Sequence, residues 1–183
     1  MPISRAFVAI RVSAELGKLS DAMRPLWPAQ GVSWVRPENL HLTLRFLGAA
    51  EDAQIAALRE GLTAVAARHE GFIATVEQSG CFPNRRRPKV IWAGVADVDG
   101  RLGALQRDVE EVVCAAGWEP EERDFRPHVT LGRVRAEVRP PRSKWSGELP
   151  RLQVPVEAVE LIESVLKPTG AEYRTLHRVM LTS

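Results

Sequence analysis

The fold-determining stretch of this chain is His41–Leu42–Thr43–Leu44, because a matching tetrapeptide, His128–Val129–Thr130–Leu131, recurs in the second half. Each tetrapeptide alternates as a half-buried β-strand does, with successive side chains on opposite faces. The histidine and threonine therefore share one face, and the two apolar residues anchor the other in the core. One His-x-Thr triplet is weak evidence. Two in the same strand context indicate a repeated unit that presents one imidazole and one hydroxyl in each half.

Outward from these motifs, short strands alternate with helices, and no low-complexity linker divides the chain. Apolar residues at helical spacing predict helices over 13–27, with Ser13 as N-cap, 51–69 and 102–117. Apolar runs bounded by turn residues predict strands over 7–12, 32–36, 41–47, 72–78, 89–95, 128–134, 156–166 and 172–181. A loop is expected around Pro140, Pro141 and Ser143. Mixed elements with hairpin-like connections favour an α+β fold with an antiparallel or mixed sheet over a doubly wound parallel one.

Composition narrows the class of protein. The 183 residues are 45% hydrophobic and 26% charged, which is too apolar for a disordered chain and sufficient for a packed core. No apolar run approaches the ~20 residues that span a bilayer, and the early run 6–10 is too short for a signal peptide, so we expect a cytoplasmic protein. Cys81 and Cys114 are expected to be buried thiols rather than a disulfide framework. The net charge of +2 permits an anionic ligand, and 21 of the 25 basic residues are arginine, whose planar fork suits phosphate.

Paired imidazoles and hydroxyls suit chemistry at a phosphate. Opening a cyclic phosphodiester with water requires a base for the water and an acid for the departing oxygen, and imidazole serves in either role near neutral pH. Threonine hydroxyls can donate to the non-bridging oxygens, whose charge must be stabilised in the transition state. We therefore predict that His41 and His128 are catalytic and that Thr43 and Thr130 bind phosphate. This requires the two halves to pack with their motifs facing one cleft.

The residues around both motifs resemble a known family. Residues 34–48, WVRPENLHLTLRFLG, are similar to the first signature of the two-histidine phosphoesterases, more narrowly of the bacterial and archaeal RNA 2′,3′-cyclic phosphodiesterases, also called 2′-5′ RNA ligases. Residues 125–133, FRPHVTLGR, are similar to the second signature. The segments 5–10, 82–95 and 163–173 also fit, so the resemblance covers nearly the whole chain. Gly132 departs from it, because many relatives have a larger residue there.

The resemblance implies a bilobal α+β fold with pseudo-two-fold symmetry, sheets lining a central cleft and helices outside. Residues 1–183 would form a single domain in which each lobe contributes one His-x-Thr motif. It implies hydrolysis of an RNA terminal 2′,3′-cyclic phosphate to a 2′-phosphate, with no metal or other cofactor. Its partner would be RNA or an oligonucleotide with such an end, for example a tRNA fragment, with no membrane and no obligate protein partner, the default state being a monomer. His41 is assigned as the acid and His128 as the base, although the near-symmetry leaves this division open.

Two arginines of the second motif are further candidates. Arg133 lies five residues after His128, which is the core face of a regular strand. We expect a bulge at Gly132 to turn it toward the phosphate, in agreement with the family pattern; the alternative is a surface salt bridge. Arg126 is expected at the mouth of the cleft, in contact with the RNA backbone or with solvent. The basic run 85–89 is expected as a solvated loop that could follow the RNA backbone.

Four residues are weaker candidates for substrate binding. Arg45 is predicted to share the face of His41. Phe46 is predicted to lie on the opposite face, so packing is favoured for it over base stacking. Trp34 and Phe82 lie near the motifs or a loop, and each could stack on a nucleobase, although packing in the core or at the rim is favoured.

Three alternatives stay open. The chain could join RNA ends through a 2′-5′ linkage without ATP, since it has no K-x-D-G motif of nucleotidylating ligases. It could act on a small cyclic nucleotide or an ADP-ribose cyclic phosphate. It could also be a non-catalytic module that binds a nucleotide or an RNA end. The presence of both histidines and both threonines argues against the last, because binding alone needs no proton donor.

Overall fold

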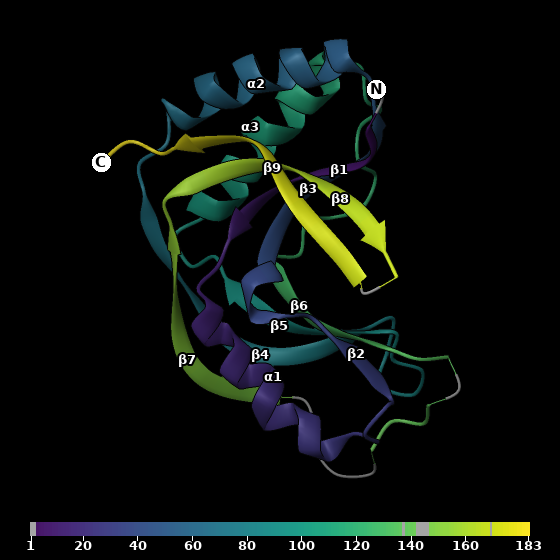
Figure 1. Cartoon of the computed structure of the whole chain (residues 1–183). Helices are drawn as coiled ribbons and strands as arrows, with labels where there is room; N and C mark the ends of the chain where they lie inside the picture. The colour runs from purple at the N-terminus through teal and green to yellow at the C-terminus, as the bar shows by residue number, and fades with distance from the viewer. Residues whose placement is uncertain (1–2, 137, 142–146, 169) are drawn as a thin grey trace.

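One antiparallel sheet of nine strands runs through the part of the chain that the computed structural model describes, residues 3–136, 138–141, 147–168 and 170–183 (Figure 1). Its strands are β1 (Ile3–Arg11), β2 (Val32–Trp34), β3 (His41–Ala50), β4 (Phe72–Phe82), β5 (Val90–Ala96), β6 (His128–Val134), β7 (Gly147–Val156), β8 (Ala158–Lys167) and β9 (Gly170–Met180). Side by side, their order is β7-β4-β5-β6-β3-β1-β8-β9, with β2 paired to β6. The predicted α+β class is confirmed.

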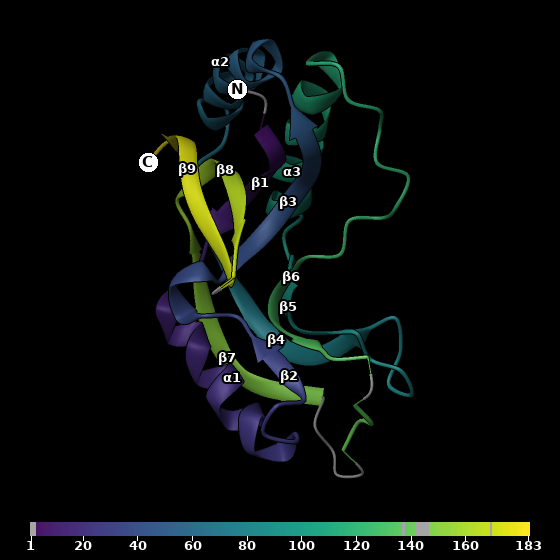
Figure 2. The same ribbon diagram turned by 45° about the vertical axis from the view of Figure 1, so that its right-hand side comes forward.

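The two motif strands lie at the centre of this order. β3 and β6 pair with each other at Leu42 and Val129, while β1 and β8 continue the sheet on one side and β5 and β4 on the other. Figure 2 shows the two halves of the sheet, with β8 and β9 above this junction and β2 and β4 below it. The arrangement places one His-x-Thr motif on the central strand of each half.

Helices cover the outside of both halves. They are η1 (Ala14–Leu16), α1 (Gly17–Met23), η2 (Arg24–Leu26), η3 (Pro37–Asn39), α2 (Asp52–Ala66) and α3 (Arg101–Ala115). α2 and α3 pack on each other and against β3, β8 and β9, whereas α1 packs against β6 (Figure 1). Each buries an apolar stripe, as the helical spacing predicts. In the described residues, no helix is long and apolar enough to cross a membrane.

The first predicted helix, over 13–27, is interrupted. Ser13 accepts a hydrogen bond from the backbone N–H of Glu15, as expected of a cap, but the α-helical part ends at Met23 and a 3-10 turn follows. The cause is Pro25, which has no N–H to donate and disfavours helical geometry in the residue before it.

Strand β7 is missing from the sequence-based prediction. Its sequence contains Pro150 and Pro155, which argue against a central strand. β7 is an edge strand paired only to β4 among the described strands, and at an edge a proline need not remove a ladder hydrogen bond. Pro140 and Pro141 lie outside any element, as expected, while Ser143 falls outside the described residues.

The core forms on the helix-covered side of the sheet, and the apolar residues of both motifs belong to it. Leu42, Val129 and Leu131 have no exposed surface, and Leu44 is 3% exposed. Both motif strands are therefore anchored from behind, as the alternation predicts. Cys81 and Cys114 are free thiols but only partly buried.

Candidate active site

β3 and β6 bring the two His-x-Thr motifs onto one face of the sheet. Leu42 pairs with Val129 across the two strands, and both side chains point into the core. Their neighbours in sequence therefore point away from the core, and the antiparallel register sets each histidine opposite the threonine of the other strand. The resulting phosphate-site cluster consists of His41, Thr43, His128 and Thr130, all partly exposed.

Both imidazoles are held by the same backbone contact. Nδ1 of His41 donates to the carbonyl oxygen of Asn39 at 2.7 Å, and Nδ1 of His128 donates to that of Arg126 at 2.6 Å. A carbonyl oxygen can only accept, so Nδ1 carries a proton in each ring. Nε2 of each histidine is left to exchange a proton with a ligand, and the pseudo-symmetry of the motifs extends to this hydrogen bond.

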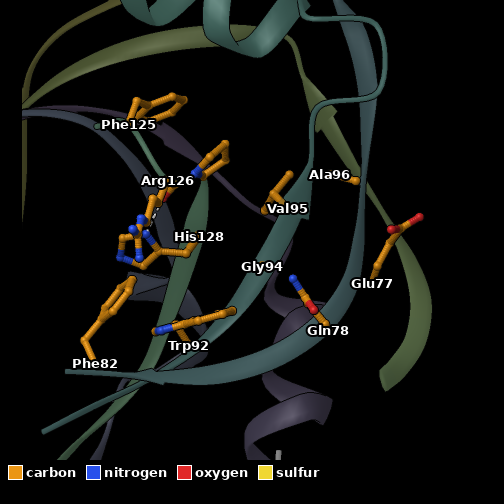
Figure 3. A pocket seen from close by; sticks show the side chains of 11 residues that line it. Glu77, Gln78, Phe82, Trp92, Gly94, Val95, Ala96, Phe125, Arg126 and His128 are labelled. Atoms are coloured by element: carbon orange, nitrogen blue, oxygen red, sulfur yellow. Dashed lines mark hydrogen bonds between the residues drawn. The ribbon is translucent and has the colours of Figure 1, made fainter. Parts of the chain in front are cut away.

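Aromatic rings fix the planes of the imidazoles. The His41 ring lies 4.8 Å from Phe7 and 5.2 Å, edge-on, from Tyr173, measured between centroids. The His128 ring lies 5.1 Å from Phe82, also edge-on, and Figure 3 shows Phe82 and Trp92 beside it. The local sequence does not indicate that Phe7 belongs to the site, because alternation along β1 does not reveal which strand lies next to it.

Burial lowers the pKa of both histidines below the ordinary value of 6.5, and the hydrogen bond to the backbone carbonyl opposes that shift in each. At His41 the positive charges of Arg11, His128 and Arg133 lower the pKa further. The free site is therefore short of negative charge, and a bound anion would favour the imidazolium forms.

Both motif strands have a β-bulge directly after the threonine. The register of β3 with β1 skips Leu44, and the register of β6 with β5 skips Leu131. One extra residue reverses the alternation beyond it. Phe46 and Arg133, each five residues after its histidine, therefore lie on the same face as the histidines.

The bulge of β6 brings Arg133 to the predicted face, but it lies at Leu131 rather than at Gly132. Arg133 is exposed, and its charge acts on His41. The glycine at position 132 is required by close packing instead, because a Cβ there would come within 2.6 Å of Cγ1 of Val32 on the paired strand. The departure from the family pattern is thus explained by close packing of β2 on β6.

The bulge of β3 makes two predictions wrong. Arg45 does not share the face of His41. It is 9% exposed on the opposite side, where its Nε donates to Glu110 at 2.6 Å and its Nη2 to the carbonyl oxygen of Glu119. Phe46, predicted to pack with the core, is instead 55% exposed on the histidine face, 6.2 Å from Phe7 between ring centroids.

Of the remaining candidates, Arg126 and Phe82 border the pockets beside His128, whereas Trp34 does not. Arg126 is exposed. Trp34 packs against the hydrophobic core, with the guanidinium of Arg24 5.5 Å above its ring. Trp34 is not among the described residues that line either pocket beside His128, so the structure gives it a packing role.

Two pockets flank His128. One, of about 340 Å³, lies against β4 and β5 and is drawn in Figure 3, where Phe82, Arg126 and His128 gather at one end and Gln78 and Glu77 at the other. The second, of about 620 Å³, lies between β3 and the segment 121–126. It borders Thr43 and Phe46 as well as His128, and thus reaches both motif strands. Within the described ranges, no group of three or more His, Cys, Asp or Glu side chains is placed to hold a metal ion.

Residues 8–167 match the sequence model of the 2'-5' RNA ligase superfamily. The chain belongs to this superfamily. It is 35% identical over 180 residues to the RNA 2',3'-cyclic phosphodiesterase of Archaeoglobus fulgidus, a match covering 94% of this chain and 97% of the relative. It is 33% identical over 180 residues to the protein of that name from Thermotoga maritima, covering 94% and 93%.

Two solved structures show the same fold. The protein TT0787 of Thermus thermophilus superposes with a TM-score of 0.82 at 30% identity, covering 97% of each chain. E. coli LigT complexed with 3'-AMP superposes with a TM-score of 0.75 at 29% identity, covering 100% of each. The family expected from the two motifs and the fold expected from it are both confirmed.

Proposed function

We propose that this chain hydrolyses the terminal 2′,3′-cyclic phosphate of an RNA to a 2′-phosphate, with His41 and His128 as the acid–base pair. One observation carries the proposal. Two imidazoles, each with Nδ1 bound to the carbonyl two residues earlier, present Nε2 on one face of the sheet beside the threonines of paired strands. The relatives named RNA 2',3'-cyclic phosphodiesterase support the substrate class.

In this mechanism the cyclic phosphate occupies the centre of the phosphate-site cluster. The hydroxyls of Thr43 and Thr130 donate to its non-bridging oxygens, and the charge of Arg133 stabilises the negative charge that grows there in the transition state. One neutral imidazole removes a proton from water as the water oxygen bonds to phosphorus. The other, as imidazolium, donates its Nε2 proton to the 3′-oxygen as the phosphorus–oxygen bond breaks. The sum is one water consumed, one 2′-phosphate and one 3′-hydroxyl formed.

Joining of RNA ends uses the same geometry with a different nucleophile. If a 5′-hydroxyl replaces water, the same departure of the 3′-oxygen leaves a 2′-5′ phosphodiester, and no ATP is consumed. Hydrolysis is favoured because water is present at a far higher concentration than any RNA end. Ligation would therefore require a second RNA bound with its 5′-hydroxyl in line with the 3′-oxygen.

The direct test is to incubate the chain with an oligoribonucleotide ending in a 2′,3′-cyclic phosphate, in the presence of EDTA, and to identify the product by ³¹P NMR. A 2′-phosphate is expected. Binding without turnover would favour the non-catalytic module, and a 3′-phosphate would contradict departure of the 3′-oxygen. Turnover of 2′,3′-cyclic AMP with no turnover of the oligoribonucleotide would favour the small-nucleotide alternative.

A further inference from the structure

A third bulge, in β4, shapes the surface beside the second motif. The register of β4 with β5 skips Glu77, so the alternation along β4 reverses between Val76, which is buried in the core, and Gln78. Gln78 and Gly80 thereby lie on the face of the sheet that His128 occupies. Because β4 lies two strands away from β6, this bulge shapes a surface next to the phosphate-site cluster rather than the cluster itself.

The indole of Trp92 lies flat over this part of the sheet. A Cβ at Gly80 would come within 2.3 Å of Cζ2 of the indole, and a Cβ at Gly94 within 3.2 Å of Cζ3, so the two glycines leave the space that the ring fills. Nε1 of Trp92 is buried without a hydrogen-bond partner among the described residues, although a buried indole N–H usually has one. The ring is therefore placed by packing rather than by a hydrogen bond, and its exposed part is apolar.

The indole forms one wall of the pocket of about 340 Å³, here called the Trp92 pocket. Phe82 and His128 lie at one end of the ring, with the centroid of Phe82 5.3 Å from that of Trp92 and 5.1 Å from that of His128. At the other end the amide of Gln78 points into the pocket, whereas the carboxylate of Glu77 points away (Figure 3). An aromatic wall with a polar group at its edge suits a nucleobase, which stacks through its faces and hydrogen-bonds through its edge.

The position of the Trp92 pocket relative to the cluster selects the nucleotide. Trp92 pairs with Thr130 across β5 and β6, and Gly80, under the indole, pairs with Trp92 across β4 and β5. At about 4.8 Å between neighbouring strands, the ring lies about 5 to 10 Å from β6. The nucleoside with the cyclic phosphate must lie against the cluster, because its own ribose carries the phosphorus. The Trp92 pocket borders only His128 of the cluster, and thus fits the base of the preceding nucleotide.

Basic side chains lie beyond the indole. A hollow of about 750 Å³ borders Trp92, and Arg85 and Arg86 line it, with no carboxylate among the described residues around it. Oδ1 of Asn84 accepts hydrogen bonds from the backbone N–H groups of Arg86 and Arg87, at 3.0 and 3.1 Å. These bonds fix the turn that carries the arginines. The hollow therefore suits a phosphodiester of an RNA chain.

We propose that, in the reaction proposed above, the base of the nucleotide preceding the cyclic phosphate stacks on Trp92 with its edge at Gln78, and the phosphodiester on its 5′ side meets Arg86. Arg126, which is exposed and borders both pockets beside His128, faces the phosphodiester between the last two nucleotides. The assignment rests on the proposed function, and it makes an RNA chain of at least two nucleotides a better substrate than a mononucleotide.

The second base is tested with 2′,3′-cyclic AMP, a diadenylate ending in a 2′,3′-cyclic phosphate, and the same dinucleotide without its first base. Because one base–aromatic stack is gained, the wild-type KM for the diadenylate should be about 5- to 100-fold below the other two. Trp92→Leu should remove most of this difference, and Trp92→Phe less of it, because phenylalanine keeps a ring. A disturbance of His128 would affect all three substrates alike. Equal wild-type KM values, or equal penalties of Trp92→Leu on cyclic AMP and the diadenylate, would overturn the second base site.

Gln78→Ala tests the edge of the same base at an exposed side chain whose loss leaves the core intact. Loss of one hydrogen bond should raise KM for the diadenylate by about 2- to 10-fold and leave KM for cyclic AMP unchanged. Gln153→Ala, at an exposed glutamine on the neighbouring strand β7, is the matched control. If Gln78→Ala behaves like Gln153→Ala on the diadenylate, the base does not reach Gln78.

The path of the chain is tested with Arg86→Ala on the diadenylate and on a triadenylate with the same cyclic end. The increase in KM should be several-fold larger for the triadenylate, and added salt should reduce the difference. Arg59→Ala, on the exposed face of α2, is the control. If Arg86→Ala matches Arg59→Ala on the triadenylate, the chain does not continue across this turn. Absence of wild-type turnover on every substrate would instead contradict the proposed function.

Discussion

His41 and His128 have the same backbone anchor but different surroundings. Each donates Nδ1–H to the carbonyl two residues earlier, so the rings differ only in what lies around Nε2. His41 has Tyr173 and the positive charges of Arg11 and Arg133 on its side, while His128 borders the pocket of about 620 Å³ between β3 and the segment 121–126. The local sequence predicts the pair of imidazoles. Their surroundings differ because of the neighbouring strands, which no local pattern identifies.

Replacing either histidine with alanine is expected to lower kcat by about 10²- to 10⁴-fold, because each removes one proton transfer. Folding should be retained, since both side chains point away from the core, and circular dichroism checks this. A substrate with sulfur in place of the 3′-oxygen identifies the acid, because a thiolate departs without a proton. This substrate should restore much of the rate of His41→Ala and little of that of His128→Ala. A variant with near wild-type turnover would exclude that histidine from the mechanism.

The lowered pKa values predict the pH dependence. The free enzyme needs one neutral imidazole and one imidazolium, and both pKa values lie below 6.5, so kcat/KM should be bell-shaped with its maximum below about pH 6.5. Bound phosphate favours the imidazolium, so the kcat profile should lie at higher pH. The same lowered pKa values make the free energy of unfolding depend on pH. As the pH falls below 6.5, these histidines take up protons in the unfolded chain before they do so in the folded chain, so their contribution to stability is lost. A flat rate profile from about pH 5 to 9 would contradict paired imidazoles.

Strands β3 and β6 show where sequence patterning reaches its limit. Alternation correctly predicts the face of each histidine and threonine, and helical spacing predicts α2 and α3 to within a few residues. Beyond Thr43 alternation fails, because the bulge depends on pairing with β1, and so it misplaces Arg45 and Phe46. Patterning misses β7 for a similar reason: only the finished sheet shows that its prolines lie at an edge.

The displaced Arg45 links β3 to the segment that leads to His128. Its guanidinium binds one carboxylate oxygen of Glu110, whose other oxygen accepts from the backbone N–H of Glu121. Arg45→Ala would leave the carboxylate of Glu110, 20% exposed, without its cation, so we expect a loss of about 3–5 kcal/mol in the free energy of unfolding. The double substitution Arg45→Met with Glu110→Leu should recover much of it, because no buried charge is left unpaired. Urea denaturation measures both, and a loss below about 1 kcal/mol for Arg45→Ala would refute a structural ion pair.

The molecule as a whole is two similar halves joined through one sheet. Because β3 pairs with β6, the sheet is continuous across the junction and neither half ends there in a free edge strand. We infer that residues 1–183 fold as one domain. The wild-type chain should therefore unfold in urea in a single transition, with coincident curves from tryptophan fluorescence and circular dichroism. Two separated transitions would show that the halves are independent domains.

The junction also brings together two motifs that are distant in the sequence, and the central claim is that their imidazoles act on one phosphorus. A crystal structure of the chain with inorganic phosphate tests this most directly. We expect Nε2 of His41 and Nε2 of His128 each within about 2.6–3.2 Å of an oxygen of the same phosphate, with the threonine hydroxyls on its other oxygens. A phosphate bound by one histidine alone, with the other ring turned toward a separate pocket, would contradict the account.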